Sequence, residues 1–168
     1  QTCALPISTD ITSSIYRGAA PFSEPETAAI EAFMTSRNFV QTFSVHAYTD
    51  ILLRPWSFDV ADPTNVAEYQ VVGDALTAAN GIEHGGTAEV LYIAAGGAID
   101  HHHLVHGALS WTPELGRGDE GGFWPDPSKS VEISNRHQTM FRVLALMSGP
   151  YLGIESVSVV EGSGADGD

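Results

Sequence analysis

The sequence predicts an α/β fold in which helices pack on both faces of a mixed, mostly parallel, twisted sheet. Apolar residues recur with helical spacing in some segments and with strand alternation in others, and the two kinds alternate along the chain. The 168 residues are 43% hydrophobic and 17% charged, a composition typical of a chain that buries a core. In such sheets ligands gather at the carboxyl ends of strands, so we expect a site there.

The first predicted elements are a loop, a helix and a strand. Residues 8–22 are rich in Ser, Thr, Gly and Pro, which predicts a loop. Ser23 and Glu26 match a capping box, which predicts a helix that ends near Ser36. Its expected buried face consists of apolar residues at helical spacing, namely Ile30, Phe33 and Met34. Alternation over residues 39–48 predicts a strand.

A second helix, a loop and a strand are expected next. Asp62 is a typical N-cap residue and Pro63 suits the first helical position, so a helix is predicted to begin there and to end before Asn80. Its apolar stripe consists of Val66, Tyr69, Val72 and Leu76. Residues 81–88 are glycine-rich and predict a loop, and residues 89–95 predict a strand.

The C-terminal part predicts a short helix over residues 99–105, a strand over 108–115 and a long helix over 127–147. The expected buried face of the long helix consists of Met140, Val143, Leu144 and Met147. Residues 154–160 alternate like a strand, so residues 151–168 are expected to begin a β-domain or to form an acidic tail.

Composition also excludes several functions. The net charge is −14, with 21 acidic against 7 basic residues, and such a surface repels the phosphates of nucleic acids. No run of about 18 apolar residues is present, so we expect no membrane-spanning helix. The single cysteine, Cys3, excludes an internal disulfide and a cysteine-based zinc site. Residues 1–7 resemble a translated sequencing adapter and are predicted to be non-native.

Three residues stand out for their chemistry. His46 closes a predicted buried strand, and neutral imidazole is a good zinc ligand. Glu114 lies in an apolar strand, where a carboxylate is costly unless it is paired or functional. Tyr92 precedes a run of small residues, 94–98. From spacing alone, a satisfied core histidine and an edge glutamate are the more common explanations of the first two residues.

Four motifs, in order, resemble the C-terminal half of the catalytic domain of carboxypeptidase A-type zinc metallopeptidases. They are Tyr16–Thr27, Phe43–Tyr48, Tyr92–Asp100 and Ser110–Leu115. The resemblance extends over about residues 13–150, within an expected domain of residues 8–150. It implies the carboxypeptidase-like α/β fold, with the N-terminal half missing.

The resemblance implies a zinc cofactor and a role for each matching residue. His46 would be the third zinc ligand, and Glu114 would be the general base. Tyr92 would close over the substrate. Ile99 would stand at the base of the pocket for the C-terminal side chain. Two further residues would contact the substrate, Thr112 in that pocket and Tyr48 further from the scissile bond.

The same resemblance implies which partners the parent protein has and which functional residues this chain lacks. The parent protein would cleave C-terminal residues from peptides or proteins, and a secreted or periplasmic location is expected. The His-x-x-Glu motif that carries two zinc ligands does not occur in these 168 residues. The Asn-Arg pair that grips the substrate carboxylate and the arginine that stabilises the oxyanion would lie upstream of Tyr16, so they are missing as well. We therefore expect this chain alone to be inactive.

Two other functions and one other metal site remain open. The chain could belong to an N-acyl amino acid hydrolase of the desuccinylase or aspartoacylase type, or to a non-catalytic domain that kept the fold. His101, His102 and His103 stand where an aromatic-rich stretch is usual, and consecutive residues rarely converge on one metal. On a helix, His102 and His106 lie at i, i+4 and could bind one instead.

Overall fold

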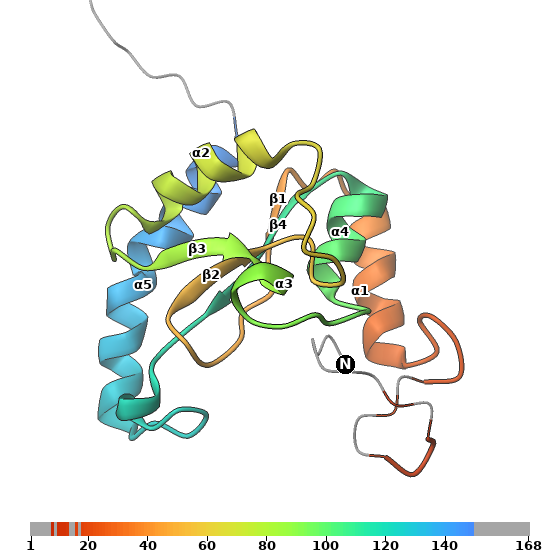
Figure 1. Cartoon of the computed structure of the whole chain (residues 1–168), viewed down its shortest axis with the longest axis horizontal. Coiled ribbons are helices and arrows are strands. Elements are labelled where there is room, and N and C mark those ends of the chain that lie inside the picture. The colour runs from red at the N-terminus through yellow and green to blue at the C-terminus, as the bar shows by residue number, and fades with distance from the viewer. Residues whose placement is uncertain (1–7, 9, 14–15, 17, 150–168) are drawn as a thin grey trace, which may run out of the picture.

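The computed structural model describes residues 8, 10–13, 16 and 18–149, and within them a four-stranded sheet forms the centre (Figure 1). The spatial order is β1-β4-β2-β3. The strands are β1 (Gln41–Phe43), β2 (Ile51–Arg54), β3 (Glu83–Gly86) and β4 (Leu109–Glu114). β1 pairs with β4 and β2 with β3 in parallel, whereas β2 and β4 are antiparallel. The sheet is therefore mixed and mostly parallel, as predicted.

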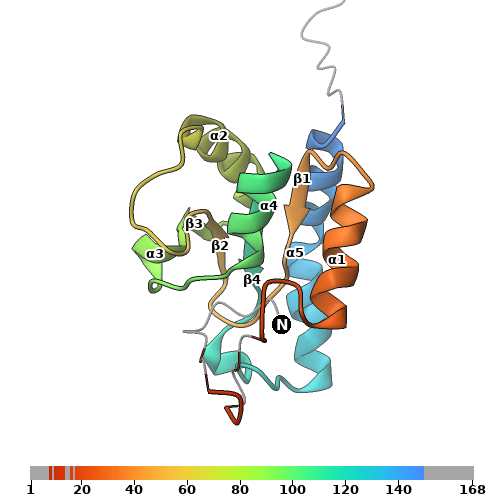
Figure 2. The ribbon, with the colours of Figure 1, turned by 90° about the vertical axis from the view of Figure 1, so that its right-hand side faces the viewer.

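Helices cover both faces of this sheet. Thr42 and Phe43 are neighbours on β1, so their side chains point to opposite faces. Thr42 Oγ1 contacts His102 Nδ1 of α4 at 3.4 Å, whereas the Phe43 ring packs on Phe141 of α5. Figure 2 shows α4 and α5 on opposite sides of β1 accordingly. The helices are α1 (Pro25–Thr35), α2 (Val66–Thr77), α3 (Thr87–Val90), α4 (Ala98–His106) and α5 (Pro127–Met147), with a 3₁₀ turn η1 (Gly118–Glu120).

The main core lies between the sheet and the helices α2 and α5. Its buried members come from four elements and one loop, and they are Leu52, Tyr69, Val72, Leu76, Ile82, Trp111 and Met140. Tyr69 also has a polar role, because its hydroxyl oxygen accepts a hydrogen bond from the backbone N–H of Ser110 at 3.0 Å. This core fixes β4, the strand that carries Glu114, against two helices.

Several predicted elements are confirmed. The long helix spans Pro127–Met147, as predicted, and its predicted apolar face packs on the core. α4 and β4 match their predicted positions within two residues at each end. The apolar stripe of α2 is buried at Tyr69, Val72 and Leu76. The described helices include none that is long and apolar enough to cross a membrane.

Two predicted helix starts are wrong. The N-cap of α1 is Glu24, without a side-chain capping bond, because the Ser23 hydroxyl donates to the Glu24 carboxylate instead. α2 begins at Val66, not near Asp62, because the Asp62 carboxylate pairs with Arg54 at 2.6 Å. On α1 only Met34 of the predicted face is buried, while Ile30 and Phe33 are exposed.

The central strands also differ from the prediction. β1 is only three residues long, although its backbone pairing resumes at His46. β2 was not predicted, and β3 occupies half of the expected glycine-rich loop. Residues 89–95 form no strand, because α3 ends at Val90 and an irregular segment follows. The predicted strand over residues 154–160 and the predictions for residues 1–7 and 151–168 lie outside the described residues.

Candidate active site

A pocket opens at the carboxyl ends of β1 and β4, on the sheet face that α4 covers. It encloses about 370 Å³ of space that is open to solvent. Its polar lining comes from both strand ends, the loop after β2, α3 and the loop that follows α3. These polar residues are Ser44, His46, Ser57, Thr87, Tyr92, Thr112 and Glu114. The predicted position of a site at strand ends agrees with this location.

His46 and Glu114 are brought together by backbone pairing beyond β1. The His46 N–H donates to the Pro113 carbonyl at 3.0 Å, and the Leu115 N–H donates to the His46 carbonyl at 2.9 Å. His46 Nδ1 lies 3.9 Å from Glu114 Oε1, and their side chains are 23% and 13% exposed. Burial raises the pKa of the Glu114 carboxyl, so this group has a greater affinity for a proton than an exposed glutamate.

The other wall of the pocket is built by α4 and the segment before it. Ile99, in the first turn of α4, is buried and lines the pocket, as do Ala98 and Gly97. Thr112 faces the pocket from β4, and Tyr92 lines it while its ring is partly exposed. Five of the six predicted site residues thus share one lining.

Asp100, the neighbour of Ile99, is not among the lining residues. Its Oδ1 accepts a hydrogen bond from the Ser57 N–H at 2.9 Å, which ties α4 to the loop after β2. Burial raises the pKa of this carboxyl, and the bond from Ser57 opposes that rise. The pocket wall that α4 and the segment before it form therefore contains no charged side chain.

Tyr48, the sixth predicted residue, lies outside the pocket lining. Its ring packs edge to face on Phe123, with ring centroids 4.8 Å apart, and lies against Gly122. A Cβ at Gly122 would come within 3.1 Å of that ring, so the glycine permits the contact. Tyr48 connects the rim of the site to the loop after β4.

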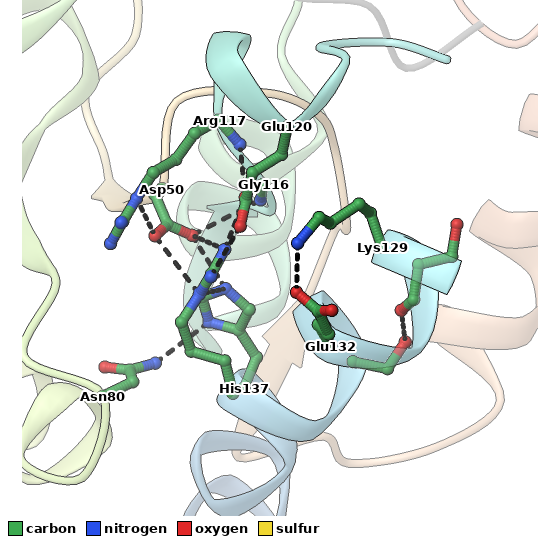
Figure 3. A network of polar contacts seen from close by, with 11 residues as sticks. Asp50, Asn80, Gly116, Arg117, Glu120, Lys129, Glu132 and His137 are labelled. Atoms are coloured by element: carbon green, nitrogen blue, oxygen red, sulfur yellow. Dashed lines mark hydrogen bonds and ion pairs between the residues drawn. The ribbon is translucent and has the colours of Figure 1, made fainter. Parts of the chain in front are cut away.

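A buried network centred on Asp50 holds the segment that follows Glu114 (Figure 3). Asp50 Oδ1 accepts from His137 Nε2 at 2.8 Å and from the Gly116 N–H at 3.3 Å. Asp50 Oδ2 accepts from Arg117 Nε at 2.8 Å. Desolvation lowers the pKa of His137, against the opposing effect of Asp50. Sequence reasoning missed this network because its members share no motif.

The histidine run does not act as a unit. His102 contacts Thr42, and His103 Nδ1 lies 3.2 Å from the Tyr69 hydroxyl. His101 and His106 instead both approach Glu31 of α1. The possible metal pair of His102 and His106 stays a prediction: their ring centroids lie 6.3 Å apart, while His102 also contacts Thr42 of the sheet.

The residues of the pocket do not make a complete zinc site by themselves. A catalytic zinc takes three protein ligands and one open position. Within the described part of the chain, the only trio of His, Cys, Asp or Glu ligand atoms close enough to share an ion excludes His46. Among the residues that line the pocket, His46 offers the one imidazole.

Comparisons with a family model and with individual proteins point to the same family. A family model described as zinc carboxypeptidase matches residues 4–140. Carboxypeptidase O from Bos taurus is 28% identical over 157 residues, which cover 89% of this chain and 41% of the relative. Carboxypeptidase A5 from Macaca fascicularis is 37% identical over 95 residues, or 52% of this chain and 22% of the relative. The chain thus spans less than half of these curated relatives.

Solved structures agree. Bovine thrombin-activatable fibrinolysis inhibitor, in complex with tick carboxypeptidase inhibitor, superposes with a TM-score of 0.75 at 25% identity, covering 84% of this chain and 51% of that one. Carboxypeptidase A from Helicoverpa armigera has the same fold, with a TM-score of 0.73, 21% identity and coverage of 84% and 38%. With the sequence match extending over most of its length, the chain belongs to the zinc carboxypeptidase family.

Proposed function

We propose that this chain supplies the specificity-pocket side of the active site of a zinc carboxypeptidase, an enzyme that hydrolyses C-terminal peptide bonds. The observation that carries the proposal is the shared lining of one pocket by His46, Glu114, Tyr92, Ile99 and Thr112. These residues come from four separate segments of the chain. Their types match the needs of a metal-assisted hydrolase, because imidazole, carboxylate and phenol sit beside an apolar wall.

Glu114 is the proposed general base. Its raised pKa, caused by burial, favours acceptance of a proton from a water molecule in the cleft. The same carboxyl can then return that proton to the leaving amine. When bound, zinc supplies the Lewis acid that lowers the pKa of its water. His46 is the proposed imidazole ligand, and its backbone pairing with β4 fixes its place beside Glu114.

The remaining ligands belong, in this proposal, to parts of the protein outside these 168 residues. The chain covers only 22–41% of the curated relatives described above, which leaves room for them. It follows that the chain alone does not hold the catalytic zinc at His46 and does not hydrolyse peptides. Robust metal-dependent cleavage by the purified 168-residue chain would contradict this division.

The substrate would lie along the pocket with its C-terminal side chain towards Ile99. Thr112 and Tyr92 then contact the terminal residue, since both line the same space. Tyr48, beyond the pocket, contacts residues further from the scissile bond. Peptide and protein C-termini are the proposed partners of the parent enzyme.

The test is to extend the gene upstream, express the longer protein and measure peptide hydrolysis. Glu114→Gln should lower kcat by about 10²–10⁴, the usual contribution of general acid–base catalysis. Glu132→Gln serves as the control, because Glu132 is an exposed helix residue that pairs with Lys129 on the surface. Loss of activity in the control, or full activity in Glu114→Gln, would contradict the proposed base. Binding of peptides without turnover by the longer protein would favour the non-catalytic alternative.

A further inference from the structure

We propose a second divalent-metal site, formed by Glu31 of α1 with His101 and His106 of α4, which takes Zn²⁺ or a similar transition-metal ion. The three side chains come from two helices about 70 residues apart in sequence, and their ligand atoms all lie within 4.8 Å of one another. This site contains none of the residues proposed for catalysis.

The imidazole nitrogens of both histidines converge on one carboxylate oxygen of Glu31. His101 Nε2 lies 2.8 Å from Glu31 Oε2, and His106 Nε2 lies 3.0 Å from the same oxygen. Residues five apart in a helix stand about 140° apart around its axis, so their rings meet only because Glu31 sits between them. The ring centroids of His101 and His106 are 5.4 Å apart, and Phe22 packs edge-on against His101.

The donor set suits a borderline metal. Zn²⁺ binds imidazole nitrogen at about 2.0–2.1 Å and carboxylate oxygen at about 2.0–2.2 Å, which places tetrahedral ligand atoms about 3.3 Å apart. The two N···O distances are slightly shorter than this, so a metal needs the rings to withdraw by a few tenths of an ångström. Imidazole and carboxylate together favour Zn²⁺, Ni²⁺ or Cu²⁺ over Mg²⁺ or Ca²⁺.

The surroundings leave a place for a fourth ligand. The side chains of Glu31, His101 and His106 are 25%, 29% and 13% exposed. A water molecule can therefore complete the coordination from the solvent side, while the buried parts of the rings keep the ligands in place. A simple ion-pair role would hold α1 against α4 in the same way, but it requires only one histidine. The presence of two on one carboxylate oxygen points to a cation at their junction.

The proposal predicts that the bound metal cross-links two helices. A metal bound by both helices joins α1 to α4, the helix that also carries Ile99. Zinc binding should therefore raise the melting temperature of the chain, since a ligand that binds only the folded state stabilises it. Failure of this site would leave the proposed peptidase function untouched, because the two sites share no residue.

The experiment is a zinc titration of the metal-stripped 168-residue chain, followed by calorimetry and by NMR of the histidine side chains. We expect one Zn²⁺ per chain, shifts in the His101 and His106 ring signals and a higher Tm. Glu31→Gln and His106→Gln should each weaken zinc affinity by about tenfold or more, the scale of losses at metal sites. His84→Gln is the matched control, because the His84 ring pairs with Asp74 instead, and it should change the affinity by less than about twofold. His102→Gln and His46→Gln are measured as well, to test whether those rings bind the ion.

Three outcomes would overturn the proposal. No saturable binding up to about 1 mM Zn²⁺ would do so. So would binding that survives Glu31→Gln but is lost in His46→Gln or His102→Gln. Finally, the proposal would be overturned if zinc shifted only the ring signals of His46, His84 or His102 in the unmutated chain. This result requires no variant. Circular dichroism identifies variants that fail to fold, and the unmutated chain then decides the question through its NMR signals.

Discussion

Two carboxylates outside the cleft, Asp50 and Glu120, hold the segment that follows β4. Asp50 bonds the backbone of Gly116, two residues beyond Glu114. Glu120 accepts hydrogen bonds from both terminal nitrogens of Arg136, at 2.8 and 2.7 Å, and Arg136 also approaches Asp50. A bidentate contact of this kind fixes orientation as well as distance. The end of the strand with the proposed base is thus held by α5.

Glu120 gives a pH-dependent prediction. Its pKa is lowered from 4.5 to about 2, mainly by the hydrogen bonds from Arg136. Because the pKa is lower in the folded state, this interaction stabilises the fold above pH 4.5 and is lost as the pH falls towards 2. The free energy of unfolding should therefore fall over that range, and Glu120→Gln should show a smaller fall. Urea unfolding at stepped pH measures both, with Glu132→Gln as the exposed control. Parallel curves for Glu120→Gln and the unmutated chain would contradict the prediction.

Ile99 gives a prediction on specificity. It lines the pocket as an apolar side chain, and Asp100 is bonded to the Ser57 backbone instead of facing the substrate. The wall formed by α4 offers a lysine or arginine head group no acidic partner, so burying that charge there has a large cost in free energy. The longer enzyme should prefer peptides ending in Phe or Leu over Arg or Lys by about tenfold or more in kcat/KM, equal to about 1.4 kcal/mol.

The same assay tests the cause of that preference. Ile99→Asp should reduce or reverse it, because a carboxylate at the base of the pocket can pair with a basic side chain. Peptides ending in Ala serve as a reference that needs little of the pocket. A basic preference in the unmutated enzyme would show that Ile99 does not set specificity.

At the scale of elements, α2 and β3 meet through a glycine and a histidine. A Cβ at Gly73 would lie 2.6 Å from the His84 ring, whose Nε2 is 3.0 Å from Asp74 Oδ1. Gly73 is therefore required in the helix interior, despite its cost of about 1 kcal/mol relative to alanine. The missing side chain lets the ring of His84, which belongs to the edge strand β3, lie against α2.

We expect Gly73→Ala to have opposite effects in two backgrounds. In the unmutated chain, the new methyl group overpacks His84 at a cost of about 1–3 kcal/mol, which exceeds or cancels the gain in helix propensity. In the His84→Ala background the clash is absent, so the same substitution should stabilise by up to about 1 kcal/mol. Urea unfolding of the four proteins measures the coupling. The same effect in both backgrounds would show that the ring moves aside freely.

Local signals explain which elements could be predicted. α5 is marked in the sequence by Pro127 at its first position and by apolar residues at helical spacing, and the Asp126 side chain caps it. β3 carries two glycines and no alternation, and it forms because β2 pairs with it in parallel. β2 is short and lies between two strands, so its formation depends on contacts that no local pattern encodes.

The same distinction applies to the sites. His46, Tyr92 and Glu114 stand in short motifs that resemble a family, so the sequence pointed to them before their convergence could be seen. Glu31 is 70 and 75 residues from its histidines, and no periodicity links them. Asp50 likewise looks like an ordinary loop residue until α5 packs beside it. Sites assembled by tertiary contacts alone leave no trace in sequence spacing.

At the scale of the whole molecule, charge is strongly unbalanced. The 21 acidic and 7 basic residues leave a net charge of −14. Repulsion among like charges destabilises a compact state, and salt screens it over a Debye length of about 10 Å at 0.1 M. The ion pairs described above act in the opposite direction, but 7 lysine and arginine residues cannot pair one to one with 21 acidic residues.

We therefore expect the melting temperature to rise as NaCl increases from about 10 mM to about 0.3 M, where the Debye length has become short. KCl at the same ionic strength should produce the same rise, because screening depends on ionic strength and not on the identity of the cation. Differential scanning calorimetry measures the shift. A falling melting temperature would mean that attractive pairs, such as Glu120 with Arg136, outweigh the general repulsion.

The residues of the Asp50 network lie far apart in the sequence, and this separation determines when their contacts can form during synthesis. Asp50 and its partner His137 are 87 residues apart, and Gly116 is 66 residues away. At about 5–20 residues per second, a ribosome needs about 4–17 seconds to reach His137 after adding Asp50. Until then the Asp50 carboxylate lacks its partners from α5. The nascent chain thus carries His46 and Glu114 before the contacts that hold the end of β4 can exist.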